Sequence, residues 1–84
     1  MSGGAMKKRV KLTFPPHLVK EPILFTIAKR YDVMPNIRRA RVTDTSGEMI
    51  LELDGQQDNL DRSIEALKAQ GVEVEELEGD IFPA

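Results

Sequence analysis

Residues 6–14 read Met-Lys-Lys-Arg-Val-Lys-Leu-Thr-Phe, a stretch in which apolar and polar side chains alternate. The apolar face comprises Met6, Val10, Leu12 and Phe14, and the polar face comprises Lys7, Arg9, Lys11 and Thr13. A period of two is typical of a β-strand that buries one face. Pro15 and Pro16 follow at once, and neither can donate to a strand ladder, so the strand is predicted to end at Phe14.

The next segment has the spacing of an amphipathic helix. Its apolar stripe is Leu24, Ile27, Ala28 and Tyr31. Pro22 suits the first turn, where its missing N–H costs nothing, and Asp32 and Pro35 bracket the exit. Phe25 lies off this stripe, on the side of Leu18, and is expected to pack against the core there rather than to anchor a partner.

A second strand is predicted over residues 36–44, with Ala40 and Val42 facing the core. Ile37 has the wrong parity for that set. A β-bulge or irregular entry near Arg38 would correct the parity, because one extra residue shifts the alternation by one place.

The rest of the chain repeats the strand and helix patterns. Residues 45–47 (Thr-Ser-Gly) form a predicted hairpin turn, and residues 48–54 form a third strand with Met49, Leu51 and Leu53 inward. Asp58 is the expected N-cap of a second helix, whose inner stripe is Leu60, Ser63, Ile64 and Leu67. Gly71 is expected to stop that helix in the left-handed conformation, before a fourth strand that runs from Val72 to about Leu77.

The predicted order is therefore βαββαβ. Each strand has only one apolar face, so both helices must cover the same side of the sheet. Right-handed crossovers then give a four-stranded antiparallel sheet of order 4-1-3-2, which is the ferredoxin-like sandwich of the α+β class. Residues 1–5 are interpreted as a disordered leader, residues 6–78 as the domain and residues 79–84 as a loose tail.

The amino-acid composition excludes several classes of function. The chain has 84 residues, of which 40% are hydrophobic and 31% charged, as expected for one small globular domain. It has no cysteine and one histidine, which excludes iron–sulfur clusters, thiol catalysis and multi-histidine metal sites. No apolar run exceeds three residues, which is too short for a membrane-spanning helix or for the apolar region of a signal peptide. The cytoplasm is therefore the expected compartment.

Charges on the helix-free face are predicted to alternate in sign from strand to strand. In sheet order they are Glu73 and Glu75, then Lys7, Arg9 and Lys11, then Glu48 and Glu52, then Arg39 and Arg41. Oppositely charged neighbours across strands stabilise a sheet. The central strands carry no aromatic side chain on this face for base stacking, and the net charge is −2, so a nucleic-acid partner is not expected.

The second strand is a sheet edge, and edges invite pairing with another chain. Its arginines (Arg38, Arg39 and Arg41) have two interpretations: they protect the edge, or they allow one specific contact, a homodimer formed through residues 36–44.

No catalytic constellation is visible, and an enzyme is not expected. His17 follows two prolines, and no serine stands in a recognisable relation to it. The carboxylates near the end of the chain are interpreted as a solvated acidic edge, so neither a metal site nor a cofactor is predicted. The loop after the first strand has too few backbone donors to cradle a phosphate.

Short motifs along the chain resemble the NIL domain family over residues 8–78. They include residues 12–15 (Leu-Thr-Phe-Pro), 20–23 (Lys-Glu-Pro-Ile), 31–33 (Tyr-Asp-Val), 36–37 (Asn-Ile), 64–67 (Ile-Glu-Ala-Leu) and 71–75 (Gly-Val-Glu-Val-Glu). The resemblance implies a ferredoxin-like regulatory domain, as at the C-terminus of the ATPase subunits of bacterial methionine importers, where it binds methionine and restrains transport.

The same resemblance implies a ligand site at Asn36, Ile37 and Arg38. A carboxamide has two donors and one acceptor, which suit the carboxylate and ammonium of an amino acid. The alternative interpretation of Asn36 is a turn cap before the second strand. The family motif has leucine where this chain has Arg38, which must face solvent or an anion. We therefore expect a non-enzymatic module that binds methionine or a related amino acid at a homodimer interface, with a ligand-free protein-interaction module as the alternative.

Overall fold

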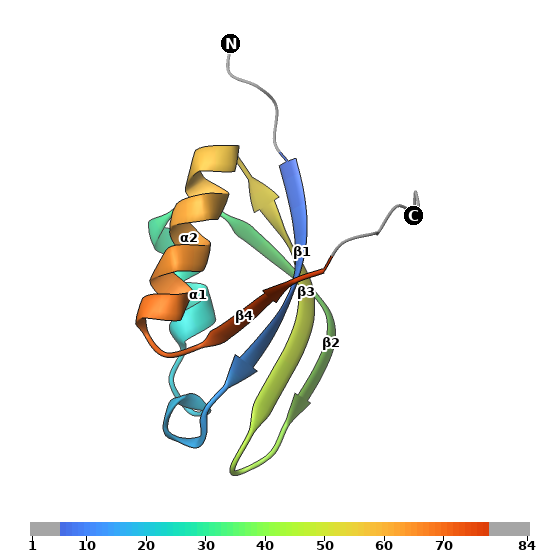
Figure 1. The fold of residues 1–84 in the computed structure, drawn as a ribbon, viewed down its shortest axis with the longest axis vertical. Coiled ribbons are helices and arrows are strands. Elements are labelled where there is room, and N and C mark those ends of the chain that lie inside the picture. Colours follow the sequence, from blue (N-terminus) through green and yellow to red (C-terminus); the bar gives the residue numbers. More distant parts are fainter. Residues whose placement is uncertain (1–5, 78–84) are drawn as a thin grey trace.

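The computed structural model describes residues 6–77, which fold as βαββαβ (Figure 1). The elements are β1 (Met6–Phe14), a 3-10 turn (Pro16–Leu18), α1 (Ile23–Arg30), β2 (Met34–Val42), β3 (Gly47–Gly55), α2 (Gln57–Ala69) and β4 (Glu73–Glu76). The expected leader at 1–5 and tail at 79–84 lie outside the described residues, as does residue 78.

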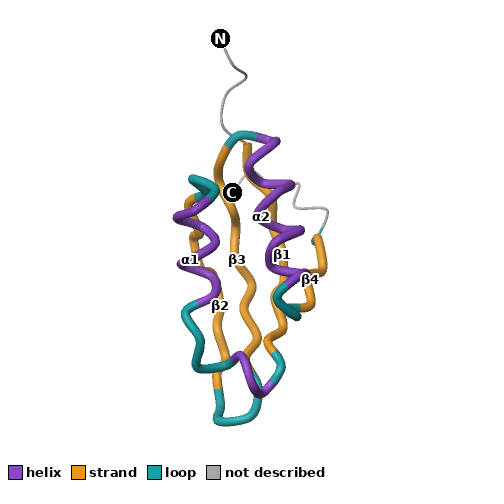
Figure 2. The backbone as a smooth tube through the Cα atoms, turned by 90° about the vertical axis from the view of Figure 1, so that its left-hand side faces the viewer, coloured by secondary structure: helices purple, strands orange, loops and turns teal. Residues whose placement is uncertain are grey.

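The sheet has the order β2-β3-β1-β4, with all neighbours antiparallel, so the predicted topology is confirmed. Both helices lie on one face of the sheet, on the left in Figure 1. In Figure 2, α1 lies on the side of β2 and α2 on the side of β1 and β4. The other face of the sheet carries no element of residues 6–77.

The predicted bulge in β2 is confirmed. Ile37 pairs with Leu51 and Arg39 pairs with Ile50, which leaves Arg38 as the extra residue. Ile37 therefore faces the helices, in phase with Ala40 and Val42, as the parity argument required. The strand begins at Met34 rather than Asn36 and ends at Val42 rather than Asp44. It can include Pro35 because an edge strand does not need every ladder donor.

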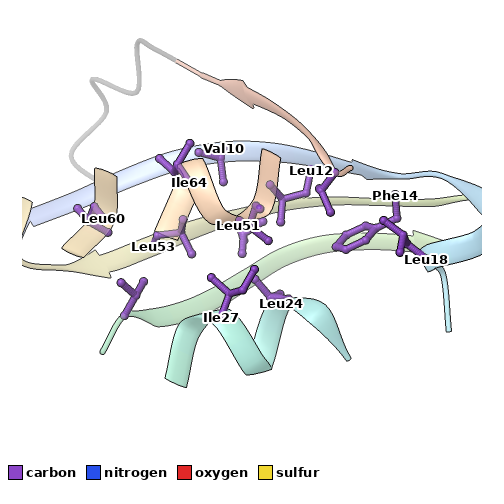
Figure 3. Close-up of a cluster of buried hydrophobic side chains, with 13 residues drawn as sticks. Val10, Leu12, Phe14, Leu18, Leu24, Ile27, Leu51, Leu53, Leu60 and Ile64 are labelled. Atoms are coloured by element: carbon purple, nitrogen blue, oxygen red, sulfur yellow. The ribbon is translucent and has the colours of Figure 1, made fainter. Parts of the chain in front are cut away.

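A single hydrophobic core lies between the helices and the sheet (Figure 3). Val10, Leu12, Leu51 and Leu60 are fully inaccessible to solvent, and Leu53 and Leu67 are 1% exposed. These side chains come from β1, β3 and α2, the elements for which the sequence has the clearest periodicity. Met49, which was expected to face the helices, is partly buried against this core, as is Val74 of β4.

Both helices end in the same way. At the end of α2 the amide of Val72 donates to the carbonyl of Leu67 at 3.1 Å, and Gly71 has a φ of 103°. At the end of α1 the amide of Val33 donates to Ala28 at 2.9 Å, and Asp32 has a φ of 58°. This is the Schellman arrangement with a left-handed residue after the cap. The glycine stop was expected; the equivalent role of Asp32 was not.

The start of α2 differs from the prediction. Its N-cap is Gln56, whose side chain makes no capping hydrogen bond, and Asp58 lies inside the first turn. Asp58 stabilises the helix there through its negative charge near the N-terminus and through an ion pair with Arg62 at 3.7 Å. Aspartate is favourable at both positions, so composition alone did not distinguish them.

Candidate binding surface along strand β2

The candidate site lies along β2, which is an edge of the sheet over its nine residues. One side of this strand pairs with β3, and its other side has no partner strand among residues 6–77. Side chains of β2 point alternately to the helix side and to the helix-free side, except at the bulge, where Arg38 and Arg39 both lie on the helix-free side. The strand thus presents two different surfaces to a molecule that approaches the edge.

The helix side of this edge is apolar and only partly covered. Ile37 and Val42 are 44% and 56% exposed, and Phe25 of α1 is 60% exposed. The reason is the length of α1, which has eight residues and leaves the end of β2 bare. A shallow groove of about 200 Å³ results, lined by Phe14, Val19, Glu21, Pro22, Leu24, Phe25, Val42, Gly47 and Met49.

Two sequence expectations are corrected by this groove. Ala40 and Val42 face the helix side as predicted, but both are exposed instead of buried. Phe25 was expected to pack against the core and instead projects from it. Periodicity predicts which side of the strand these side chains face, but it does not predict how much of β2 the short helix α1 covers.

The helix-free side of β2 is polar. Asn36 Nδ2 donates to Asp54 Oδ2 at 3.3 Å, and Arg38 Nη2 donates to Glu52 Oε1 at 3.0 Å. Glu52 also accepts a hydrogen bond from Arg9 Nη2 at 3.1 Å, so one carboxylate joins β1, β2 and β3. These two bonds, that from Arg9 first, hold the pKa of Glu52 below its ordinary value despite the opposing effect of burial.

The three predicted ligand-binding residues therefore lie around the edge of β2 rather than in one pocket of the monomer. Asn36 and Arg38 are on the helix-free side, and Ile37 is on the helix side. Only a molecule that lies along the strand edge, or a second protein chain there, can contact all three. The Glu52 bridge was not foreseen, although the alternating charges of neighbouring strands were a signal for it.

The predicted cross-strand charge pairing is confirmed between β1 and β3. The outer strands pair through residues other than the predicted ones, β2 through Arg38 to Glu52 and β4 through Glu76 to Lys8. Lys11 pairs with Glu48 at 3.4 Å, and Arg9 with Glu52. Arg39 and Arg41 make no ion pair with any residue of 6–77. Together with Glu48 and Ile50 they line an open hollow of about 290 Å³ on this side of the sheet.

Other candidate chemistry is sparse within the described part of the chain. His17 is exposed in the 3-10 turn. Over residues 6–77 no three histidine or acidic side chains gather as they would around a metal ion. Neither α1 nor α2 has the length and apolar character needed to cross a bilayer.

Comparison with known proteins places the chain in a family. Residues 8–76 match the NIL domain profile, which is most of the chain. The chain belongs to the NIL domain family. This NIL domain is 33% identical over 70 residues to "Methionine import ATP-binding protein MetN 1" of Bacillus cereus, covering 79% of the chain and 20% of that protein. The protein of the same name from Listeria monocytogenes is 32% identical over 78 residues, covering 88% and 23%.

A solved structure has the same fold as this NIL domain. It is the C-terminal domain of an ABC transporter/ATP-binding protein from Enterococcus faecalis, with a TM-score of 0.74 and 27% identity. The match covers 87% of this chain and 86% of that one. By contrast, the chain spans only about a fifth of the length of the curated relatives that it matches. The similarity to these relatives therefore concerns a regulatory domain and not their whole length.

Proposed function

We propose that this NIL domain is a cytoplasmic, non-catalytic regulatory module that binds methionine or a related amino acid at a homodimer interface formed by β2. The observation that carries the proposal is the exposed edge of β2. Its free backbone adjoins the exposed apolar side chains Ile37 and Val42. The relatives named as methionine import proteins indicate the class of ligand.

Dimerisation through β2 would extend the sheet. Two antiparallel β2 strands related by a twofold axis would form one continuous eight-stranded sheet, with the helices of both copies on the same side. The exposed apolar side chains of the edge would then be covered by their counterparts. A dimer also supplies the concave surface that a single copy of this size lacks.

The ligand would be held by residues that remain available for bonding. Among residues 6–77, Asn36 makes one side-chain hydrogen bond, to Asp54, and so retains its carbonyl oxygen and one N–H. Arg38 uses one of its five N–H groups on Glu52. The amide and the guanidinium could thus bind the amino acid's polar groups, and Ile37 could contact its side chain.

Isothermal titration with methionine tests this function. Loss of the Asn36 carboxamide would leave a bound polar group unpaired, so Asn36→Ala should weaken binding by roughly 5- to 150-fold, equivalent to about 1–3 kcal/mol. The ligand-free melting temperature should stay unchanged, because Asn36 is exposed. Asn59→Ala is the matched control, since Asn59 lies in α2.

Two results would contradict the assignment. The first is a native protein that binds no methionine at millimolar concentration. The second is an Asn36→Ala variant that binds normally but melts several degrees lower, which would make the hydrogen bond to Asp54 the role of this side chain.

A second candidate is a protein-interaction module without a small ligand. The groove beside Phe25 favours it, because an apolar side chain that is 60% exposed is suited to contact another protein surface. The two candidates differ in one measurement. Methionine should tighten self-association of a ligand-binding module and leave that of a simple interaction module unchanged.

A further inference from the structure

The cations on the helix-free face differ in whether they are neutralised. Arg9 and Lys11 of β1 are within 3.1 and 3.4 Å of glutamates of β3, and Arg38 shares one of these glutamates. Arg39 and Arg41, on the exposed edge strand, make no ion pair with residues 6–77. Positive charge is therefore uncompensated along the edge that the proposed dimer uses.

Antiparallel pairing of two β2 strands would bring these arginines together in the register that centres the twofold axis on Ala40. A twofold axis at Ala40 sets Arg39 opposite the partner's Arg41, and Arg41 opposite the partner's Arg39, all on the helix-free face. Side chains directly opposite each other have Cβ atoms about 4.5–5.5 Å apart, and like charges at that spacing destabilise the pair. Glu48, the nearest carboxylate across the register from Arg41, already pairs with Lys11 at 3.4 Å.

We propose that an oxyanion bridges this dimer, bound by Arg39 and Arg41 of both copies. The inference rests on the homodimer proposed above. Arginine binds phosphate and carboxylate through paired N–H groups, so four converging guanidinium groups suit such an ion. The hollow of about 290 Å³ beside Ile50 is open on this face and supplies the room. A free phosphate and the carboxylate of the amino acid ligand share this chemistry.

The bridge makes association depend on the anion. An ion that binds the dimer and not the monomer tightens association by the factor 1 + [L]/Kd. For a dissociation constant of about 1 mM, phosphate at about 10 mM would tighten the dimer about tenfold. Chloride at the same ionic strength would only screen the arginines and should have a smaller effect.

The experiment is sedimentation equilibrium of the native protein in sodium phosphate, in sodium chloride of matched ionic strength, and in chloride with methionine. Phosphate should tighten the dimer about tenfold over chloride. The double variant R39Q/R41Q should dimerise to the same extent in both salts. The control K20Q/K29Q removes the same charge from exposed positions outside the sheet and should respond to phosphate as the native protein does.

Each arm separates one explanation from another. A native dimer that forms equally well in phosphate, in chloride and in chloride with methionine overturns the anion bridge but leaves the proposed dimer intact. A dimer that responds to methionine and not to phosphate assigns the site to the carboxylate of the ligand if R39Q/R41Q loses that response, and overturns the bridge if R39Q/R41Q keeps it. A protein that is monomeric under every condition refutes the proposed dimer itself, and with it the bridge, and makes edge protection the role of these arginines.

Charge reversal supplies a second measurement. A mixture of the native chain with R39E/R41E should form a heterodimer in chloride alone, because each arginine then faces a glutamate across the twofold axis. If the mixture associates no better than the native chain, the arginines do not face each other in the dimer, and the proposal is wrong.

Discussion

Leu51 is the residue whose truncation tests the fold most directly. It lies in the middle of β3, is fully inaccessible to solvent, and pairs with Val10 on one side and Ile37 on the other. Leu51→Ala removes three carbon atoms from the centre of the core, at an expected cost of about 2–5 kcal/mol. A domain of this size has a total stability of roughly 4–11 kcal/mol, so the variant should lose a large part of it.

Urea denaturation followed by circular dichroism measures this loss. A loss of about 1 kcal/mol lowers the melting temperature of a domain of this size by about 4–8 °C, so the melting temperature should also fall by at least about 8 °C. Ile50→Ala is the matched control, because the neighbouring residue on the same strand is half-buried and faces away from the helices. The control should lose less than about 1 kcal/mol. Equal losses for the two variants would refute the assignment of the buried face.

Three further predictions concern charge and backbone. Glu52→Gln should reduce the free energy of unfolding at about pH 7 and should make that free energy fall less as the pH is lowered. The reason is that a carboxylate whose pKa is lowered in the folded state stabilises the protein above its ordinary pKa and loses this contribution as the pH falls through the folded value; urea titrations at several pH values measure the effect. Gly71→Ala should lower stability by about 1 kcal/mol or more in thermal melts, because φ is 103° there. Asp32→Gly should raise stability by up to about 1 kcal/mol, and a lower melting temperature would instead mean that its carboxylate stabilises the turn.

The sequence predicted the parts of the fold that local patterns determine. Val10 and Leu12 alternate with charged residues, and Leu60, Ile64 and Leu67 repeat at helical spacing, so their burial follows from periodicity. The bulge at Arg38 was also accessible, because Ile37 has the wrong parity for a regular strand. In each case the information lies within a few neighbouring residues.

The candidate site was less predictable because it depends on distances between elements. The bridge from Glu52 to Arg9 and Arg38 requires the register of three strands, which no single segment contains. The exposure of Phe25 depends on how far α1 extends over β2. Pro35 was interpreted as bracketing the exit of the first helix, because proline breaks helices. It lies instead within β2, because an edge strand tolerates proline.

The pairing of β1 with β4 affects how the domain can be joined to other polypeptides. The amide of Leu77 donates to the carbonyl of Arg9 at 2.9 Å, so the described part of the chain begins and ends on neighbouring strands at the same end of the sheet. Such a domain can be inserted into a surface loop of another protein without forcing the two ends of that loop apart. The same proximity suits circular permutation of residues 6–77, with a short linker from Leu77 to Met6 and new termini opened in the exposed turn between Thr43 and Ser46.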